Sequence, residues 1–580
     1  MVKKGHTNRN RDLTTLLAGV AIIILINFIG SFAFHRFDLT SEKRYTLSDN
    51  SKNLVAGLDD IVYVKVYLEG EFPAGFKRLR DETREILDEF RAYAGGNLEY
   101  EFINPSESPD EKERESIYKQ LYKEGLRPTD LNVKEEDGTS NKIIWPGALI
   151  SYQGQEFPIQ LLKSQMGVSP EMMLNSSVEA LEYEFLNAIN NLKRFSKPRV
   201  AFIEGHGELD KVQTASLATS LAEFYTVDRL EINQELSSLT ERVMVDSTHD
   251  FAVQIKYDVI IIAKPSQKFS EKDKFIIDQY IMHGGRVVWL VDPVFASMDS
   301  LQNADISMAI PQDLNLDDQL FTYGVRINTN LVQDIQSAPI PVVTGRIGNQ
   351  PKTQMFPWFF FPLLTPANSH PIVNNLNAVK GEFVSTIDTI ARPKVRKTGL
   401  LKTSKYSKVS NTPTRISLGM LRYEPDQSQY NAGHQVTAVL LEGYFQSVFK
   451  NRITPEIGNS REVNFRDESK YNKMIVVADG DIAKNYVNVK TSQYYQLGYD
   501  RYTNQQYGNN DFMLNVINYL CDDNGLMSVR SKKLTIRLLD KTILKKDKFK
   551  WQLINTVLPI GLILLFGIAH YYDRKKKYTK

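Results

Sequence analysis

The sequence predicts an α/β protein that is anchored in a membrane at both ends. The stretch 198–208, PRVAFIEGHGE, begins as a buried strand and then turns at Gly-His-Gly. A strand, a helix and a second strand follow within 257–293, which is one βαβ unit of a parallel sheet. Apolar runs at 13–34 and 553–572 are long enough to cross a hydrocarbon core of about 30 Å.

Composition limits the classes of function. A chain of 580 residues is long enough for several domains, and 42% apolar with 24% charged residues is ordinary globular material. A net charge of +2 gives no electrostatic reason to expect a nucleic-acid partner. The single cysteine, Cys521, excludes a disulfide within the chain.

Basic residues flank both apolar runs and predict the orientation. Lys and Arg precede the first run and follow the second, so both termini are expected in the cytoplasm and the domain between them outside it. The alternative for the first run is a cleaved signal peptide, because Ser31-Phe32-Ala33 has small residues where a signal peptidase requires them. The apolar run is, however, longer than the hydrophobic core of a usual signal peptide. The basic segment 541–552 is expected to lie against lipid headgroups or to be solvated.

These patterns predict a division of the chain into eight parts. They are a cytoplasmic N-terminus (1–12), a transmembrane helix (13–34), a first extracytoplasmic α/β domain (35–175), a connecting helix (176–197), a central α/β domain with insertions (198–540), the basic juxtamembrane segment (541–552), a second transmembrane helix (553–572) and a cytoplasmic tail (573–580).

The first domain shows the pattern of a small thioredoxin-like fold. Strand, helix and strand patterns occupy 61–68, 76–94 and 98–103, and a helix near 111–124 precedes a strand pair. No Cys-x-x-Cys occurs, which excludes thiol redox chemistry. Pro128 and residues 135–141 are expected in exposed loop. The helix at 177–195 is amphipathic; we expect it to dock on the central domain, with partner binding as the alternative.

The central domain carries the clearest local signals. Four consecutive β-branched residues at 259–262 suit a parallel strand covered on both faces. Ser270 is placed to cap a helix that Gly284-Gly285 ends, and RVVWLV at 286–291 is the next strand. Strands at 435–441 and 474–478 are expected to join the same sheet, and a helix is expected at 511–520.

Ligands of open α/β sheets bind at the carboxyl ends of the strands. The carboxyl edge of the central sheet is therefore the candidate ligand or partner site. Imidazole and carboxylates there suit a metal or a general base, whereas the plainer interpretation is turn structure. Asp479 and Asp481 form an Asp-Gly-Asp turn that is expected near the first strand. The candidate residues are Glu204, Gly205, His206, Gly207, Glu208, Asp292, Asp479 and Asp481.

Two aromatic stretches are further candidates for contact. FPWFFFP at 356–362, with Trp358 and Phe359, is either a buried strand or an exposed docking patch. The stretch 493–510, with Tyr494, Tyr495 and Tyr499, is either an ordinary loop or a surface that stacks on sugar rings or another protein. No Walker A, Gly-x-Gly-x-x-Gly, Gly-x-Ser-x-Gly or His-Glu-x-x-His motif occurs.

Nine segments spread over nearly the whole chain carry a resemblance to a known family. They are RFDLTSEKRYTLS, VYLEGEFPAGFKRL, PRVAFIEGHGE, YDVIIIAKP, FIIDQYIMHGGRVVWLVDP, KNRITPEIGNSRE, MIVVADGDIA, GNNDFMLNVINYL and RSKKLTIRLLDK. In these segments the chain resembles the gliding-motility-associated ABC transporter auxiliary proteins of the GldG type. The resemblance implies an inner-membrane subunit that accompanies a multi-span permease and, through it, a cytoplasmic ATPase. It also implies an amidotransferase-like central domain, here without a nucleophilic cysteine at a strand-to-helix elbow.

These observations predict a non-catalytic subunit without a cofactor or metal, which couples a permease and ATPase to envelope or motility-machinery proteins on the periplasmic side. The first alternative is a solute-binding component with a cleft near 204–208 and Asp292. The second alternative is a protein descended from a hydrolase or an amidotransferase that has kept activity through His206.

Overall fold

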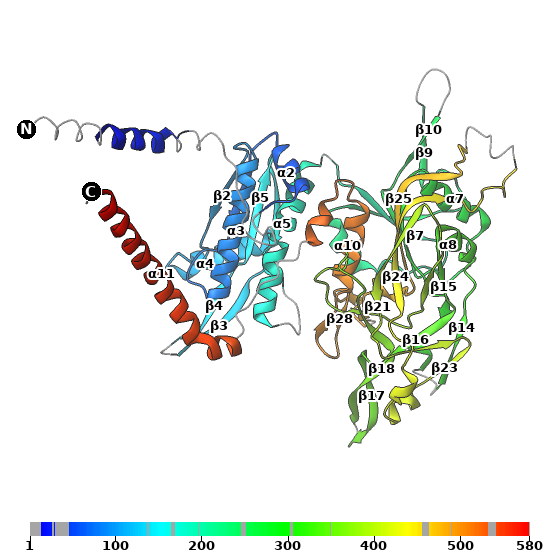
Figure 1. Ribbon diagram of the computed structural model, residues 1–580. Helices are drawn as coiled ribbons and strands as arrows, with labels where there is room; N and C mark the ends of the chain where they lie inside the picture. Colours follow the sequence, from blue (N-terminus) through cyan, green and yellow to red (C-terminus); the bar gives the residue numbers. More distant parts are fainter. Residues whose placement is uncertain are drawn as a thin grey trace, which may run out of the picture. The chain divides into compact units, whose positions relative to one another are not determined.

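The computed structural model describes residues 13–25, 28, 46–135, 138–163, 169–194, 196–244, 251–301, 306–348, 350–454, 463–488, 490–531 and 541–578 (Figure 1). The chain divides into two compact units, one made of Met1–Asp38 with Tyr45–Lys532 and the other of Leu39–Arg44 with Lys533–Lys580. Both α/β domains lie in the first unit.

The first domain is built on a four-stranded sheet in the order β2-β1-β5-β6. β1 runs parallel to β2 and antiparallel to β5, which pairs with β6. The expected strand-helix-strand start is confirmed. The elements are α2 (Asp49–Ala56), β1 (Val62–Val66), α3 (Ala74–Tyr93), β2 (Leu98–Phe102), α4 (Glu111–Lys123), β5 (Gly147–Tyr152), β6 (Gln155–Gln160) and α5 (Pro170–Lys193).

Two expectations for this domain are wrong. The segment expected as loop at 135–141 belongs largely to a hairpin of β3 (Thr129–Glu135) and β4 (Gly138–Ile144), which stands apart from the main sheet. The backbone hydrogen bonds of such a two-stranded ribbon do not require alternating apolar side chains. The polar sequence of this hairpin therefore gave no strand pattern. The connecting helix begins at Pro170 rather than near Ser177, because the Ser169 hydroxyl caps Met172 N–H and proline suits the first helical position.

The helix α5 serves both domains. It packs on β5, β6 and α3, and it also contacts the short helix η5 (Leu526–Ser531) near the end of the central domain. The expectation that it leads from one domain and docks on the next is therefore confirmed.

The central domain is organised around a ten-stranded mixed sheet in the order β17-β18-β21-β24-β25-β12-β11-β7-β8, with β19 paired to β18. The five strands from β25 to β8 are parallel, and the others run antiparallel. The predicted return of two late strands to this sheet is confirmed by β24 and β25. The bounds are β7 (Arg199–Glu204), β8 (Thr226–Glu231), β11 (Val259–Ala263), β12 (Arg286–Leu290), β17 (Ser337–Ile347), β18 (Gln350–Pro366), β19 (Val379–Lys380), β21 (Val395–Lys402), β24 (Val436–Gln446) and β25 (Glu468–Val477).

Helices cover both faces of the parallel strands, which explains why β11 is apolar throughout. Val259 and Ile261 pack in a core with α6 (Ala215–Ala222) and α10 (Asn509–Leu520). Ile260 and Ile262 pack in the opposite core with α7 (Glu271–Met282) and α8 (Asp317–Tyr323). Alternate side chains of a strand point to opposite faces, so a strand between two helical layers needs apolar residues at every position.

The cap signals of α7 are confirmed. Ser270 Oγ accepts the Asp273 N–H at 3.1 Å, and Gly284 follows the helix with φ +104°. Since these interactions are local, the sequence alone located both helix ends.

Smaller elements complete the domain. The stretch 298–311 contains the short helix η1 and the strand β14, which pairs with β13 and β23. The elements are β9 (Thr240–Met244), β10 (Phe251–Ile255), β13 (Val294–Phe295), η1 (Asp299–Leu301), β14 (Ile306–Pro311), β15 (Val325–Ile327), β16 (Asn330–Asp334), β20 (Ile387–Thr389), β22 (Ser407–Asn411), β23 (Thr414–Ser417), η2 (Leu418–Arg422), η3 (Gln427–Gln429), η4 (Asp481–Ala483), β26 (Val487–Asn488), β27 (Gln493–Tyr494), β28 (Tyr499–Asp500) and β29 (Gln505–Gln506).

The C-terminal segment is one helix, α11 (Lys541–Tyr578), which includes the basic segment as well as the apolar run. Among the described residues, its part Asp547–Lys576 is the one stretch long and apolar enough to cross a membrane. The first apolar run is helical over Leu13–Leu25, and most of its remainder lies outside the described residues.

Candidate functional site

The turn after β7 holds His206 between two carboxylates. The imidazole Nδ1 lies 3.2 Å from Glu208 Oε1, Nε2 lies 3.3 Å from Asp273 Oδ2, and the ring stacks on Phe269 with centroids 3.8 Å apart. Burial alone would lower the pKa of His206, but Glu208 and Asp273 outweigh it and raise that pKa above its usual value. The contacts fasten the turn to the first turn of α7.

Backbone contacts close the sheet edge at this place. The His206 carbonyl accepts N–H bonds from Ser266 at 2.9 Å and Gln267 at 2.8 Å, and the Ser266 hydroxyl donates to the Gly207 carbonyl at 2.9 Å. Gly207 has φ +71° and Gly205 has φ +108°. The crevice where strand order reverses, between β7 and β11, is therefore filled by the two loops that would have lined it.

Glu204 takes no part in that turn. Its carboxylate pairs with Arg229 on the neighbouring strand β8. The Arg229 guanidinium also donates to Thr214 Oγ1 at 2.8 Å and to the Leu209 carbonyl at 2.9 Å. Glu204 thus neutralises an arginine that crosses the end of the sheet.

The second cluster lies at the ends of β11, β12 and β25. Lys264 follows β11, and its Nζ lies 3.2 Å from Asp292 Oδ2 and also pairs with Asp481 Oδ2. Asp292 accepts the Gly480 N–H at 2.6 Å. Asp479 accepts the N–H groups of Glu382 at 2.9 Å and Asp481 at 2.8 Å. One ammonium group therefore joins carboxylates from two strand ends.

Burial and mutual repulsion perturb these carboxyls in different directions. Burial, with the charges of Asp292 and Asp481, raises the pKa of Asp479 well above its usual value, and burial likewise raises the pKa of Asp292. Burial also opposes ionisation of Asp481, but Lys264 and Lys484 outweigh it and lower its pKa. Within the described residues, no group of three or more His, Cys, Asp or Glu side chains is placed to hold a metal ion.

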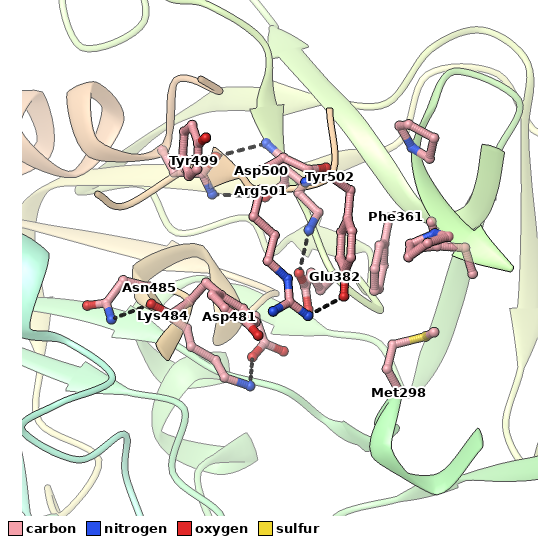
Figure 2. A pocket seen from close by; sticks show the side chains of 17 residues that line it. Met298, Phe361, Glu382, Asp481, Lys484, Asn485, Tyr499, Asp500, Arg501 and Tyr502 are labelled. Atoms are coloured by element: carbon pink, nitrogen blue, oxygen red, sulfur yellow. Dashed lines mark hydrogen bonds and ion pairs between the residues drawn. The ribbon is translucent and has the colours of Figure 1, made fainter. Parts of the chain in front are cut away.

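The Asp481 side of this cluster opens into a pocket of about 590 Å³ (Figure 2). Lys484 Nζ lies 3.3 Å from Asp481 Oδ1, and Lys380 Nζ lies 2.8 Å from Glu382 Oε1. The lining residues are Met298, Pro339, Ile340, Pro341, Phe361, Lys380, Glu382, Asp481, Lys484, Asn485, Tyr486, Gly498, Tyr499, Asp500, Arg501, Tyr502 and Asn509. This volume is within the range of small-molecule sites.

The expected aromatic contacts divide into core and surface. Trp358 is fully buried and Phe359 is 6% exposed, so the buried-strand interpretation of FPWFFFP is confirmed and these rings are not available to a partner. Tyr494 is 44% exposed, and its hydroxyl lies 3.2 Å from Thr219 Oγ1. Tyr495 and Tyr499 stack at 5.6 Å, and Tyr499 lines the pocket.

The structure thus separates residues that the sequence placed together. Asp292, Asp479 and Asp481 meet, but they meet around Lys264 rather than with Glu204 or His206, because β11 and β12 stand between β7 and β25. Sequence reasoning missed Lys264, although its position directly after the strand YDVIIIA was a usable signal. It also missed Lys484, Glu382 and Arg501, for which no local pattern exists.

Comparison with known proteins identifies a protein family. A model of the family described as "ABC-type uncharacterized transport system", whose members are transporter auxiliary proteins, matches residues 197–516, more than half of the chain. The chain belongs to this family. A second model, a domain of unknown function (DUF7088), matches residues 41–151. The auxiliary-family match therefore covers the large sheet, the acidic cluster and all residues that line the pocket.

Two individual proteins are also similar to this auxiliary-family chain. A protein of Borreliella burgdorferi, described as an uncharacterized protein, is 19% identical over 98% of this chain and 99% of its own length. The solved mmIFT52 N-terminal domain aligns at 12% identity over 56% of this chain and 98% of its own, with a TM-score of 0.31. A likeness at that level carries no argument about this fold.

Proposed function

We propose that this chain is a non-catalytic, membrane-anchored auxiliary subunit of an ABC-type complex associated with gliding motility. The observation that carries the proposal is that one chain combines the auxiliary-family domain at 197–516 with a helix able to cross a membrane at Asp547–Lys576. Its partners are a multi-span permease and, through it, a cytoplasmic ATPase. The gliding role and the GldG type rest on the sequence motifs given above.

The proposed topology has two spans with both termini in the cytoplasm and the folded domains in the periplasm. The apolar helix Leu13–Leu25 and the helix α11 support two anchors, and the flanking lysines and arginines support the orientation. Movement of the permease would reach the outer domains through the short segments 36–48 and 541–550. A flexible Gly/Ser insertion into either segment should uncouple motility, and full activity of both insertions would contradict this mechanism.

The proposed folds are thioredoxin-like for the first domain and amidotransferase-like for the central one. The order β2-β1-β5-β6 supports the first, and the parallel strands between two helical layers support the second. A nucleophilic role does not suit Cys521, which ends α10, is 5% exposed and has its pKa raised to about 12 by burial. A non-catalytic domain fits this environment.

The test is purification of the full-length chain from its own membranes in mild detergent, followed by identification of what co-purifies. A permease and an ATPase in stoichiometric amounts are the expected result. The matched control carries Leu562→Arg and Leu564→Arg within α11, which should prevent insertion of the second span and lower recovery of the permease, while the first span and the folded domains stay unchanged. Recovery of the chain alone, or with further copies of itself only, would overturn the proposal.

Solute binding is the second candidate function, and the pocket of about 590 Å³ is the observation that favours it. The place differs from the one expected. The turn at 204–208 is closed by hydrogen bonds from Ser266 and Gln267 of the loop after β11, whereas the pocket lies beside Asp481.

A further inference from the structure

Arg501 lies over two aromatic rings at the pocket wall. Its guanidinium carbon lies 3.9 Å from the ring centroid of Tyr486 and 4.4 Å from that of Tyr502, and the guanidinium also donates to the Tyr502 hydroxyl. Stacking on two rings restrains the plane of a guanidinium and leaves the donors at its edge free to bind. Figure 2 shows the group turned toward the interior of the pocket.

The other two cations of the pocket are already neutralised. Lys380 is paired with Glu382 and Lys484 with Asp481. Burial alone would lower the pKa of Lys380, but Glu382 outweighs it and keeps the ammonium charged. Among the residues that the structure describes, no carboxylate lies within ion-pair distance of Arg501. A third carboxylate of the wall, Asp500, accepts the Tyr502 N–H at 2.8 Å and is not paired with Arg501. Among the described residues of the wall, the Arg501 guanidinium is therefore the cation without an ion-pair partner.

The remaining wall suits an organic body rather than a bare ion. Met298, Ile340 and Phe361 give apolar surface, and Tyr499 gives an aromatic face stacked on Tyr495. The first residue of α10, Asn509, also lines the pocket, so the positive end of that helix is close by. Apolar surface with one directional charged group is the usual composition of a small-molecule site.

We infer that this pocket binds a small organic oxyanion, a carboxylate or a phosphate monoester, carried on a ring or apolar body, with Arg501 as the residue that binds the charge. A planar guanidinium presents two parallel donors to either oxyanion, which a lysine ammonium does not. The inference rests on the solute-binding function and not on the auxiliary role, so each can fail without the other.

The test is isothermal titration of the full-length chain in detergent micelles at neutral pH with three probes that share a phenyl ring. Phenyl phosphate and phenylacetate carry the two oxyanions, and benzyl alcohol is their neutral counterpart. At least one anion should bind saturably and at least about tenfold more tightly than the alcohol, since a charge-assisted hydrogen bond contributes that much. Which anion binds distinguishes phosphate from carboxylate ligands.

Two variants distinguish hydrogen bonding by the guanidinium from the effect of positive charge alone. Arg501→Lys keeps the positive charge but loses the fork and should weaken anion binding about tenfold. Arg415→Lys, at an exposed arginine on β23 outside the pocket, is the matched control and should change nothing. Circular dichroism of each variant confirms folding.

Three outcomes would overturn the inference. In the first, neither anion binds. In the second, the alcohol binds as tightly as the anions, which would leave a solute site without anion selectivity. In the third, Arg501→Lys binds as tightly as the parent chain. Recovery of the permease in the detergent purification would be unaffected by any of these results, so the auxiliary role is judged separately.

Discussion

Two turns follow strands at the same edge of the large sheet, and one is covered by a neighbouring loop whereas the other lines a pocket. The turn 204–208 after β7 is covered by the loop after β11, with His206 enclosed between Glu208 and Asp273. The turn after β25 places Asp481 and Lys484 on the wall of a pocket. Both turns contain charged side chains, and both follow buried parallel strands.

The difference lies in how each turn satisfies its polar groups. After β7, the His206 carbonyl binds the N–H groups of the loop after β11, which joins the two loops over the strand ends. After β25, one partly buried cation, Lys264, neutralises Asp292 and Asp481, and the outer wall stays open. A position at the carboxyl edge of a parallel sheet therefore predicts a candidate site but does not decide whether the site is accessible.

The largest effect on stability is expected from Lys264, whose ammonium group joins the carboxylates beside the turn after β25. Lys264→Met keeps the alkyl chain but leaves three buried carboxyls without their shared cation, which should lower the free energy of unfolding by about 3 to 5 kcal/mol. Chemical unfolding followed by tryptophan fluorescence measures this, because Trp289 and Trp358 are both buried in this domain.

Two further measurements sharpen that result. The loss should shrink at acidic pH, since carboxyls with raised pKa values bind protons in the folded variant and no longer repel each other. Lys268→Met is the matched control, because Lys268 pairs with Asp313 on the surface at 2.7 Å, and it should leave stability nearly unchanged. Equal stability of both variants would show that Lys264 does not hold this edge together.

A smaller effect is expected at the closed turn. A Cβ at Gly207 would lie 2.2 Å from Ser266 Oγ, in a backbone conformation of φ +71° that favours glycine. Gly207→Ala should therefore cost about 2 to 3 kcal/mol, because the loop contacts that close the edge must shift. At Gly205 the nearest atom to such a Cβ is Glu231 Cγ at 4.0 Å, so Gly205→Ala should suffer backbone strain alone and lose less. Equal thermal midpoints for the two variants would contradict the tight closure.

The smallest effect is a pH dependence of that closure. His206 has a folded-state pKa above its unfolded value, so its contribution to stability is complete below about pH 6.5 and is lost as pH rises through the raised pKa. The stability of the parent chain relative to His206→Asn should therefore fall between neutral and mildly alkaline pH. A constant difference across that range would argue against a charged His206.

His283 offers the opposite case in the same domain. Burial, followed by the charge of Arg466, lowers its pKa to about 4. Its neutral form is favoured in the folded state, so stability relative to His283→Asn should be complete above about pH 6.5 and fall as pH drops toward 4. Unfolding midpoints across pH 4 to 9 for both pairs would test the two signs in one series.

Much of the fold follows from local patterns. The unit β11-α7-β12 could be located from four β-branched residues, the Ser270 cap and Gly284, because burial on two faces and helix capping involve neighbours in the chain. The hairpin β3-β4 and the strand β14 could not, since each pairs in a small sheet without a regular apolar face.

The sequence by itself determined the family motifs, the apolar terminal helix and the parallel strands of the central sheet. Only the tertiary structure decided which strand ends are neighbours. The pairing of β12 with β25 joins segments far apart in the chain, and it brings Asp292 to Asp481 while β11 supplies Lys264. Arg501 reaches the pocket in the same way, from an irregular segment whose own residues give no sign of it. Strand order is a property of long-range packing, so the site that depends on it becomes visible only in the folded chain.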